Sequence, residues 1–598
     1  MTASPIYYVD RYDQELLSCF DEQWQQVPVV TIDCETTGLD PVRDQLTLVG
    51  IGIPAKKGFQ CWAFDINAEQ SLLQQLTPLL ESTTLLKVGH NLLFDWKFLC
   101  YRKASEFLKP TFDTFIASKL LYNGRQDLRH SLEACVQREL NLQMNKDPNL
   151  QISFHGGPYS KEQLQYLSDD LVAPLLLLKP LQEKLEQEDM LMLASLENQC
   201  IQAFTEMSLT GFLIDQTARG QLEERLNEEL IVERSKLPKV SKKDGSKTEL
   251  NFNSPNQIKE YFATVFGLNL PNTAESTLSG IRKNKAQDLA QLILRCKELS
   301  KRGDAFVAKI RLQDLHEDGR VRSNFNPLGA ASGRSTASGP NLQQVPNNPE
   351  YRSLYTAGPG NVLVICDYGQ IELRVAAELA GEVQMIEAMC RGEDLHTLTA
   401  SKCFHVPVSE VTKEQRSKAK VINFALIYAA GPKLLMGMGA AETLEQAEEI
   451  RSSFFQAYPK LSEFHRKLIR QVEKDFNRES KIGKMRTPGS NRLHWCPQQD
   501  LYYENGPLRK ATVYNRPVQG CAADGMKIAL VCLQEKLRNT RAKLVAMIHD
   551  EVIVECLNEE AENVKDLVEQ AMIEGMTTFF TEVPIVAEAT IGRSWTEK

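Results

Sequence analysis

The sequence predicts a multidomain protein in which an α/β region reaches to about residue 190 and a longer α+β region follows. The chain has 598 residues, more than one hydrophobic core usually organises, because domains mostly hold about 50–200 residues. Up to about residue 190, apolar strand-like runs alternate with helical patterns, as in α/β domains. Beyond about residue 310, loops and long helices accompany an apolar strand at 362–366 and a strand–turn–strand near 544–555.

Between these two regions the pattern predicts mostly helix. Residues 191–233 are expected to be helical with a turn at Thr210-Gly211, and further helix extends to about residue 310. A Lys/Ser/Gly/Pro-rich segment separates the two, and it should form a mobile loop. Its cations are Arg234, Lys236, Lys239, Lys242, Lys243 and Lys247. Two interpretations stay open for this basic segment: a solvated linker, or a contact with a phosphate backbone.

Composition favours a protein of the cytoplasm with no membrane partner. Hydrophobic residues make up 42% and charged residues 25% of the chain, as in soluble globular proteins. No apolar run approaches the roughly 18 residues of a membrane span, and the N-terminus lacks the pattern of a targeting segment. The 14 cysteines contain no CxxC pair, so free thiols in a reducing compartment are expected. A net charge of −9 argues only weakly against a nucleic-acid partner, since positive charge can be concentrated locally.

A first group of carboxylates follows the apolar run Val29–Ile32. Asp33 and Glu35 come directly after it, and alternation along a strand places them on one face. Residues 46–53 predict a neighbouring strand. Two adjacent carboxylates repel each other unless a cation lies between them.

Two further segments extend this group. Asp95 is expected at the start of a helix that follows the run at 85–88, and Tyr166 and Asp170 share a helix face at i and i+4. Four convergent carboxylates can hold two divalent metals about 3.5–4 Å apart, an arrangement suited to in-line phosphodiester cleavage. The three segments resemble the motifs of DEDD-type 3′–5′ exonucleases, in the variant with Tyr four residues before the last Asp. That resemblance implies metal binding by Asp33, Glu35, Asp95 and Asp170, and water positioning by Tyr166.

A second group of carboxylates lies in the C-terminal half. Asp367 ends the apolar strand 361–366, and Asp550 lies at the tip of a hairpin formed by 544–548 and 552–554. A carboxylate at the end of an apolar strand is costly to desolvate unless it is paired or ligated. Two such aspartates on adjacent strands suit two magnesium ions.

Between these aspartates, one predicted helix carries an unusual stripe. Arg416, Lys420, Phe424 and Tyr428 recur every four residues. Two cations followed by two aromatic rings suit a nucleoside triphosphate, with the cations on the phosphates and the rings against sugar and base.

These segments closely resemble the A, B and C motifs of family A DNA polymerases, the bacterial polymerase I group. Further matches are Ser332-Gly333-Arg334, Pro340 to Gln343, Asn515, and Gln519 to Asp524, while 210–215 resembles the opening of the polymerase domain. The resemblance implies an RNase H-like DEDD exonuclease domain at 1–190 and a right-hand polymerase at 191–598. The thumb would span about 225–310 and include the basic segment, the palm about 311–400 and 500–598, and the fingers about 401–499. The 5′ nuclease of many relatives is expected to be missing.

The same resemblance implies a role for each matched residue. Asp367 and Asp550 would bind two Mg²⁺ ions with the backbone of Tyr368, supported by Glu551, and Mn²⁺ could substitute. Lys420 would be the candidate acid for the leaving pyrophosphate. The expected dNTP-binding residues are Arg416, Lys420, Phe424, Tyr428, Glu372, Gln370 and His396, with Glu372 and Tyr428 excluding a ribose 2′ hydroxyl. The expected contacts with primer–template DNA are Arg334, Asn341, Gln343, Asn515, Gln519 and His549. The protein is expected to act as a monomer.

The sequence departs from the family pattern at several positions. Gly369 stands where Ser is usual, and Ala425 and Ala429 stand where the fingers helix usually has Gly. Each Gly-to-Ala change favours helix by about 1 kcal/mol, so a stiffer helix with altered mispair tolerance is expected. Ala511 replaces a usual Arg, and the region 481–495 matches the usual Arg-rich pattern poorly. Phe424, where some relatives have Tyr, predicts discrimination against dideoxynucleotides.

Two other functions compete with that of a proofreading polymerase. An exonuclease with a decayed polymerase half would show damage at Asp367, Lys420 or Asp550, and all three are intact. A structural DNA-binding protein would not need complete catalytic sets in both halves. Chromosomal, phage, plasmid and organelle roles in replication or repair all remain compatible with the sequence.

Overall fold

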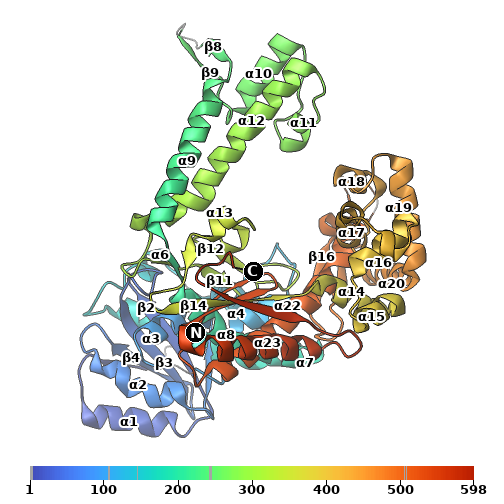
Figure 1. Cartoon of the computed structure of the whole chain (residues 1–598). Helices are drawn as coiled ribbons and strands as arrows, with labels where there is room; N and C mark the ends of the chain where they lie inside the picture. Colours follow the sequence, from blue (N-terminus) through green and yellow to red (C-terminus); the bar gives the residue numbers. More distant parts are fainter. Residues whose placement is uncertain are drawn as a thin grey trace. The chain divides into compact units, whose positions relative to one another are not determined.

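The fold is described from a computed structural model, which covers residues 5–105, 108–144, 146–241, 246–503, 506 and 508–597, without the side chains of 305 and 306. Chain contacts divide the protein into two compact units. The first unit comprises 1–210, 324–338 and 364–591, and the second comprises 211–323, 339–363 and 592–598. Figure 1 shows the elements of each unit along the chain. No helix within the described ranges is both long and apolar enough to cross a membrane.

The first unit begins with a six-stranded mixed sheet in the order β1-β4-β3-β2-β5-β6. Its strands are β1 (Ile6–Val9), β2 (Val29–Thr36), β3 (Leu46–Pro54), β4 (Phe59–Asp65), β5 (Leu86–Gly89) and β6 (Thr111–Asp113). β2 pairs antiparallel with β3 and parallel with β5, so the predicted neighbours are confirmed. Its middle residues are buried β-branched side chains such as Val30 and Ile32, which suit a strand covered on both faces.

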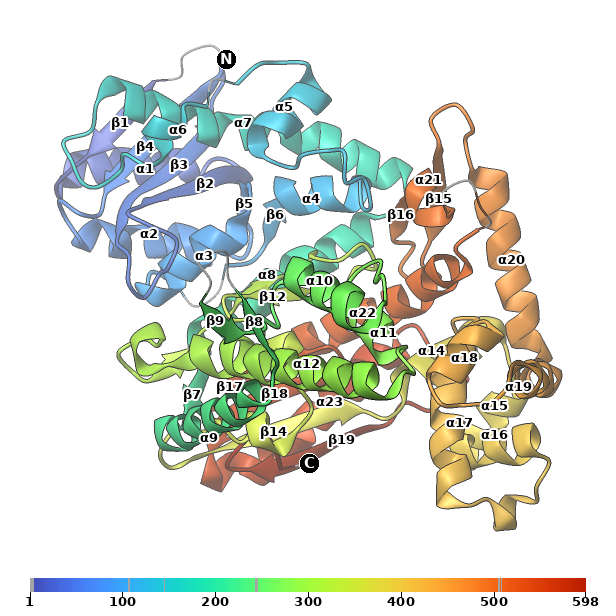
Figure 2. The same cartoon turned by 90° about the horizontal axis from the view of Figure 1, so that it is seen from above.

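Helices α1 to α7 accompany this sheet, and Figure 2 shows them from a second direction. They are α1 (Gln14–Trp24), α2 (Ser71–Glu81), α3 (Leu92–Tyr101), α4 (Thr114–Leu121), α5 (Leu132–Leu140), α6 (Pro148–Gln151) and α7 (Lys161–Gln187). The start of α7 is fixed by a capping box of Ser160 and Gln163. This helix packs on β2 and β3, and Leu167 and Leu171 lie against Gly50 and Gly52 of β3.

A second sheet in the same unit has the order β17-β18-β14-β19. Its strands are β14 (Asn361–Tyr368), β17 (Lys543–Ile548), β18 (Glu551–Leu557) and β19 (Ala587–Gly592). β17 and β18 form the predicted hairpin, because Ile548 pairs with Glu551 and leaves His549 and Asp550 in the turn. His549 has a φ of 60°, as tight two-residue turns require. Helices α8 (Leu191–Thr210), α22 (Lys510–Leu537) and α23 (Ala561–Thr577) pack together beside this sheet.

A helical group of the first unit contains α14 (Ile371–Ala380), α15 (Val383–Cys390), α16 (Leu395–Phe404), α17 (Lys413–Leu426), α18 (Pro432–Gly437), α19 (Leu444–Ala457) and α20 (Pro459–Asp475). A hairpin of β15 (Ile482–Arg486) and β16 (Leu493–Pro497) follows, with α21 (Gln498–Leu501). The predicted single helix stripe is wrong at its end. α17 stops at Leu426, so Tyr428 lies in the turn beyond it, and Ala429 has a left-handed φ of 52°. The expectation that Ala429 stiffens this helix is therefore wrong, because the residue is outside it.

Buried ion pairs join distant segments of the first unit. Glu197 on α8, Arg492, Asp524 and Lys527 are each at most 1% exposed. Arg492 donates to Asp524 at 3.1 Å and also contacts Glu197, which accepts from Lys527 at 2.6 Å. Charges buried this deeply require partners, since an unpaired ion in the interior is costly. The polar network therefore ties α8 to α22 and to the segment after β15.

The second unit is built on α9 (Gln216–Ser235), α10 (Pro255–Phe266), α11 (Glu275–Ser279) and α12 (Asn284–Arg302), with their own small apolar core. It also holds a three-stranded sheet, β10 (Arg320–Val321), β7 (Phe212–Ile214) and β13 (Tyr355–Thr356). The turn predicted at Thr210-Gly211 within the helical region 191–233 is confirmed, since α8 ends at Thr210, and the short strand β7 follows it before α9. The basic segment is partly ordered as the pair β8 (Lys239–Ser241) and β9 (Lys247–Glu249), whereas Lys242 and Lys243 lie outside the described residues.

Candidate active sites

The first candidate site lies at the end of β2. Asp33 pairs with Gly50 and Glu35 with Leu48 in the ladder with β3, so both side chains point to one face. On that face α7 supplies Asp170, and ligand oxygens of Asp33, Glu35 and Asp170 all lie within 4.8 Å of one another. Three carboxylates at this spacing form an oxygen-rich site of the kind that divalent cations bind.

Asp95 adjoins these three carboxylates but does not belong to their closest group. It lies in the first turn of α3, as predicted, and its Oδ1 accepts a 2.8 Å hydrogen bond from the backbone N–H of Cys34. Cys34 stands between Asp33 and Glu35, so this bond fixes Asp95 to the strand that carries the other ligands. The pKa of Asp95 is raised by burial and then by the charge of Asp33, which indicates that the two carboxylates are close.

A lysine that the sequence did not reveal completes the site. The Lys146 ammonium donates to Asp170 at 2.5 Å and to the Tyr166 hydroxyl at 3.0 Å. It also lies 4.3 Å from the centre of the Tyr166 ring. Lys146 comes from the segment between α5 and α6, which has no periodic pattern linking it to α7. Its proximity is a result of tertiary structure, so no local sequence signal identified it.

Burial and mutual repulsion make these carboxylates weak acids in the absence of a metal ion. Burial, and then the charge of Asp170, raise the pKa of Asp33 to about 8. The pKa of Glu35 is raised well above its usual value by burial and by Asp33. Burial raises the pKa of Asp170 to about 6, although Lys146 acts in the opposite direction. A bound cation would relieve both the desolvation and the repulsion.

The second candidate site lies where β14 meets the β17–β18 turn. Asp367 is the last but one residue of β14, and the last, Tyr368, donates its backbone N–H to the Asp550 carbonyl at 3.2 Å. Burial, and then the charge of Asp367, raise the pKa of Asp550 to about 6, so the two carboxylates interact. Glu551 begins β18 and is 3% exposed. The structure therefore brings the two predicted aspartates together, Asp367 near the end of β14 and Asp550 in the turn between β17 and β18.

A chain of polar side chains lies beside these aspartates. Glu372, in the first turn of α14, accepts from Arg334 at 2.5 Å and from the Tyr428 hydroxyl. Tyr428 also forms a side-chain hydrogen bond with Gln519, and burial followed by Glu372 raises the pKa of its phenol. Tyr428 thus reaches the predicted partner Glu372 from beyond the end of α17. Gln370 precedes α14 with a left-handed φ of 56°.

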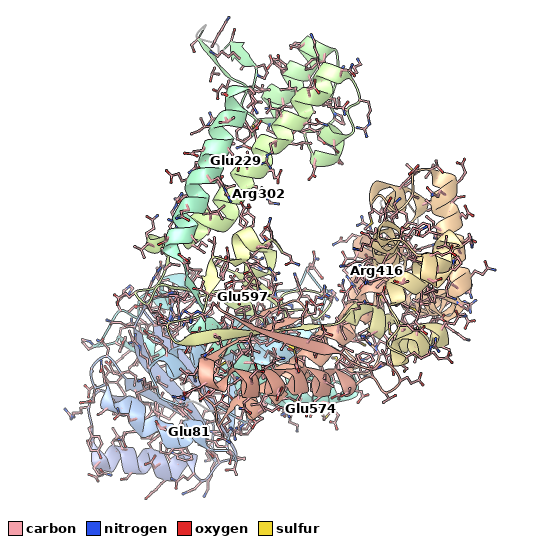
Figure 3. The ribbon with its side chains drawn as sticks, viewed as in Figure 1. Glu81, Glu229, Arg302, Arg416, Glu574 and Glu597 are labelled. Carbon is pink, nitrogen blue, oxygen red and sulfur yellow. The ribbon has the colours of Figure 1, made fainter. Side chains whose placement is uncertain are left out.

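The predicted phosphate-binding cations lie on α17. Arg416 and Lys420 are exposed and Phe424 is half-buried; Figure 3 labels Arg416 on this helix. Arg416 is held by both oxygens of Asp394, at 2.7 and 3.0 Å, a partner that the sequence did not indicate. A bidentate arginine–carboxylate pair of this kind fixes the orientation of the guanidinium.

His396 lies on α16, which packs against α17, and its side chain is only 2% exposed. Its Nδ1 is 2.9 Å from the side-chain nitrogen of Asn423, and its ring centre is 6.1 Å from that of Phe424. Burial lowers the pKa of His396, which favours the neutral ring. This histidine is therefore packed against Phe424 and is not a free surface group.

The expected DNA-binding residues fall in several places. Arg334 follows Gly333, whose φ is 88° and whose Cα faces the Arg492 guanidinium so closely that a Cβ would lie 2.6 Å from Nε. Only glycine fits there, and the turn that presents Arg334 rests on the buried ion pairs. Asn515 and Gln519 lie one turn apart on α22, and His549 is exposed in the hairpin turn. Asn341 and Gln343 belong to the second unit, where the Asn341 side chain accepts from the Gln343 N–H.

Comparisons with known proteins bear on both sites. A family model described as "3'-5' exonuclease" matches residues 8–186, and one described as "DNA polymerase family A" matches residues 220–597. The chain belongs to DNA polymerase family A. It is 31% identical to DNA polymerase I of Aquifex aeolicus over 95% of this chain and 96% of that protein.

Other members of family A resemble the chain along its length. DNA polymerase I of Pseudomonas aeruginosa is 26% identical over 99% of this chain and 67% of its own. The corresponding protein of Chloroflexus aurantiacus is 28% identical, and the chain covers 64% of it. The fold is that of a solved structure, the POL domain of Pol1 from M. smegmatis in complex with DNA primer-template and dNTP. Its TM-score is 0.81 and its identity 22%, over 99% of both chains.

This member of family A is therefore a DNA polymerase that carries a 3′–5′ exonuclease domain. Domains of both kinds use divalent metal ions, and the group of Asp33, Glu35 and Asp170 supplies the oxygen ligands that such ions prefer.

The departures of this family A chain from the usual pattern can also be located. A Cβ at Gly369 would lie 3.5 Å from the Val586 side chain, an ordinary contact, and its φ is not left-handed. The backbone therefore does not require glycine at this position. Ala425 lies inside α17 and is 7% exposed, so the argument from helix propensity applies to it alone.

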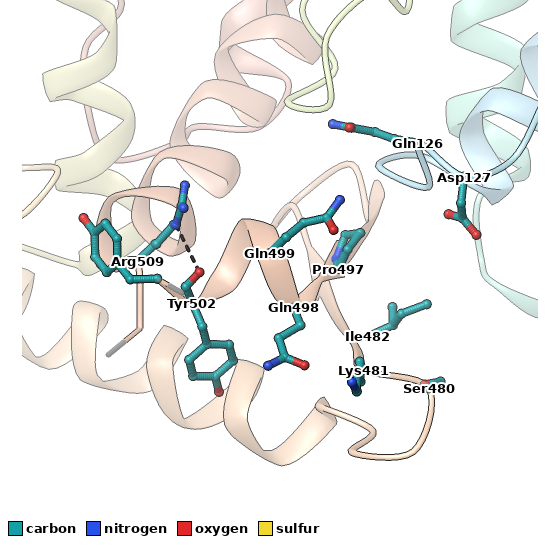
Figure 4. Close-up of a pocket in the computed structure, with 11 residues that line it drawn as sticks. Gln126, Asp127, Ser480, Lys481, Ile482, Pro497, Gln498, Gln499, Tyr502 and Arg509 are labelled. Carbon is teal, nitrogen blue, oxygen red and sulfur yellow. Dashed lines mark hydrogen bonds between the residues drawn. The ribbon is translucent and has the colours of Figure 1, made fainter. Parts of the chain in front are cut away.

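A cleft of about 680 Å³ is also found in the first unit of this polymerase (Figure 4). It lies between the loop at Gln126 and Asp127 and the segment from β15 to the start of α22. Tyr502 and Arg509 lie on one side, joined by a 3.2 Å bond from Arg509 Nε to the Tyr502 carbonyl. None of the carboxylates of the two sites lines it, so it is not a candidate for either chemistry.

Proposed function

We propose that Asp367 and Asp550 are the metal ligands of template-directed DNA synthesis from a primer 3′ end with dNTPs. The observation that carries this assignment is the approach of Asp367, near the end of the buried strand β14, to Asp550 in the β17–β18 turn, where the Tyr368 N–H donates to the Asp550 carbonyl. We assign two Mg²⁺ ions to them, together with the backbone of Tyr368, with Mn²⁺ as a substitute and Glu551 in support. When bound, such ions would activate the primer hydroxyl and hold the triphosphate.

The residues around these aspartates would bind and orient the nucleotide. Arg416 and Lys420 would contact the phosphates, since both are exposed cations on one face of α17. Lys420 would donate a proton to the pyrophosphate. Phe424, packed on His396, would stack against the sugar and base, and the remaining contacts are assigned to Gln370, Glu372 and Tyr428. The contact of Glu372 with Tyr428 supports a barrier to a ribose 2′ hydroxyl.

The primer–template DNA would be held by side chains on several elements. We assign these contacts to Arg334, Asn341, Gln343, Asn515, Gln519 and His549. Acceptors in the minor groove occupy similar places in every base pair, so contacts there test the shape of a pair rather than its sequence.

The exonuclease centre would remove misincorporated nucleotides. Asp33, Glu35, Asp95 and Asp170 are proposed to bind two divalent ions, and Tyr166 to position the attacking water. We propose the same domain boundaries as from the sequence. The exonuclease domain would span 1–190 and the polymerase 191–598, with the thumb, palm and fingers as given above. Helices α9 to α12 of the second unit would form the thumb.

Primer extension on a long gapped template tests both assignments at once. Asp367→Ala should abolish extension with dNTPs and keep degradation of the 3′ end without them. Asp33→Ala should abolish degradation and keep extension. A loss of at least about 1,000-fold is expected in each case, because a missing metal ligand disables the chemical step. Degradation that persists in Asp33→Ala, or extension that persists in Asp367→Ala, would refute the respective site.

A further inference from the structure

Lys146 introduces a positive charge among the exonuclease carboxylates. Its ammonium contacts both oxygens of Asp170 and donates to the Tyr166 hydroxyl at 3.0 Å. Asp170 in turn lies within 4.8 Å of Asp33 and Glu35, measured between ligand oxygens. The lysine therefore touches one proposed metal ligand and the residue proposed to position water.

The ammonium and a divalent cation would compete for the same oxygens. An ammonium group offers three donors and no acceptor, whereas a carboxylate offers only lone pairs. A metal ion that binds Asp170 needs lone pairs of the oxygens that accept from Lys146. An ammonium and a metal ion that shared Asp170 would also repel each other. The positive charge of Lys146 thus partly neutralises the carboxylates in the metal-free protein, and it opposes the binding of a metal ion.

The position of Lys146 combines an anchored backbone with a side chain that can move. The next residue, Asp147, caps α6 by accepting from the Asn149 N–H at 2.9 Å, and Pro148 begins that helix. The Lys146 side chain is 24% exposed, against 8% for Asp170. A lysine has a flexible four-carbon stem, so the ammonium can leave Asp170 while it keeps its hydrogen bond to the Tyr166 hydroxyl and the backbone stays in place.

We infer that Lys146 is a positioning residue of the exonuclease centre that also acts as a displaceable counter-cation. In the metal-free protein it holds Asp170 and Tyr166 in the arrangement that the reaction needs. When a divalent ion takes Asp170, the ammonium remains beside Tyr166 and orients its hydroxyl. This inference rests on the exonuclease function proposed above.

The inference predicts opposite changes in metal affinity and in rate, which a purely structural lysine would not produce. Mn²⁺ binding is measured by electron paramagnetic resonance in a chain with Asp367→Ala and Asp550→Ala, which removes the polymerase ligands. Lys146→Met should bind Mn²⁺ about three- to tenfold more tightly, because the competing charge is gone. The same change in the otherwise unaltered chain should slow degradation of a single-stranded 3′ end at least about tenfold at saturating metal, because Tyr166 loses its partner.

Two further variants separate this role from folding effects. Lys146→Arg keeps the charge and should restore the Mn²⁺ affinity of the unaltered lysine and part of the rate. Lys184 is a matched control, since it contacts Glu139 and Tyr122 in the same manner, at 2.6 and 3.3 Å, outside the metal-binding carboxylates. Lys184→Met should leave Mn²⁺ affinity and rate unchanged.

Each outcome decides between distinct claims. Mn²⁺ affinity that is unchanged or weaker in Lys146→Met overturns the counter-cation, and an unchanged rate overturns the positioning role. If Asp33→Ala alters neither the number of Mn²⁺ ions bound nor degradation of the 3′ end, the exonuclease site itself is misassigned. That result would refute the proposed function rather than the role of Lys146.

Discussion

The two carboxylate centres of this polymerase differ in where they keep their positive charge. In the exonuclease centre, Lys146 contacts the carboxylate of Asp170 directly. In the polymerase centre, the exposed cations lie on a helix of their own, and Arg416 is held by Asp394 and not by the catalytic aspartates. The first group of carboxylates is therefore in direct contact with a cation, whereas Arg416 and Lys420, the cations proposed to bind a triphosphate, are exposed on α17.

The largest expected effect concerns Glu372, a carboxylate that differs from Asp367 and Asp550 because it is not proposed to bind metal. Glu372 is paired with Arg334 and Tyr428, so it is proposed to act by occupying space and not by binding metal. Glu372→Ala should lower discrimination against ribonucleotides by about 10- to 100-fold, because the 2′ hydroxyl meets no side chain. Single-nucleotide insertion of rNTP and dNTP measures the ratio. Glu372→Gln keeps the shape and should stay close to the original ratio, and unaltered discrimination in Glu372→Ala would contradict the assignment.

An effect of intermediate size is the pH dependence of folding stability. In the metal-free protein it distinguishes the centre of Asp33 from that of Asp550. Asp33 has a pKa of about 8 in the folded state, against about 3.9 when unfolded. Between these values the folded state binds more protons, so stability falls as pH rises. With a chelator present, the melting temperature should drop by a few degrees from pH 6 to pH 8. Asp550, with a pKa of about 6, should contribute to such a decline mainly below pH 6.

Substitutions test this assignment of the pH effect. Asp33→Asn removes the titrating group and should reduce the drop between pH 6 and pH 8, whereas Asp550→Asn should leave it nearly intact. Differential scanning fluorimetry at several pH values gives the comparison. A melting temperature that is constant or rises over this range in the original chain would contradict the assigned direction.

The smallest expected effect concerns Ala425, inside α17, and Ala429, just beyond its end. Ala429 has a left-handed φ of 52°, which costs an alanine about 1–2 kcal/mol. Ala429→Gly should therefore stabilise the protein by about 0.5–1 kcal/mol, after the larger entropy of unfolded glycine is subtracted. Ala425→Gly lies within α17 and should destabilise by about 1 kcal/mol. Urea titration compares the two, and equal destabilisation by both would show that Ala429 is not strained.

Much of the fold and of the sites follows from local patterns in the sequence. The alternation along β2 and the apolar runs around Asp550 correctly predicted which carboxylates lie at strand ends. These features depend on periodicities of two and on short turns, which neighbouring residues determine. The assignment of Glu372 to Tyr428 came from the family resemblance, and the hydrogen bond between them agrees with it.

Other features could not be predicted because distant segments create them. Lys146 and Asp394 acquire their partners only when the chain folds, and neither stands in a recognisable pattern with Asp170 or Arg416. The end of α17 at Leu426 also escaped prediction, since the helical spacing of the apolar and cationic residues continues to Tyr428. The helix ends at Leu426 although the sequence favours its continuation. Tyr428, beyond this end, makes the tertiary hydrogen bond to Glu372.

The buried ion pairs around Arg492 have a consequence for shortened forms of the enzyme. Glu197 is the shared partner of Arg492 and Lys527, and it lies on α8, ahead of the region matched by the polymerase family model. A fragment truncated at the end of α8 would leave two interior cations with Asp524 as their main counterion, and breaking such pairs typically costs about 3–5 kcal/mol. A self-sufficient polymerase fragment should therefore begin no later than Leu191. Exchange of exonuclease modules between relatives should be tolerated best when the junction precedes that helix.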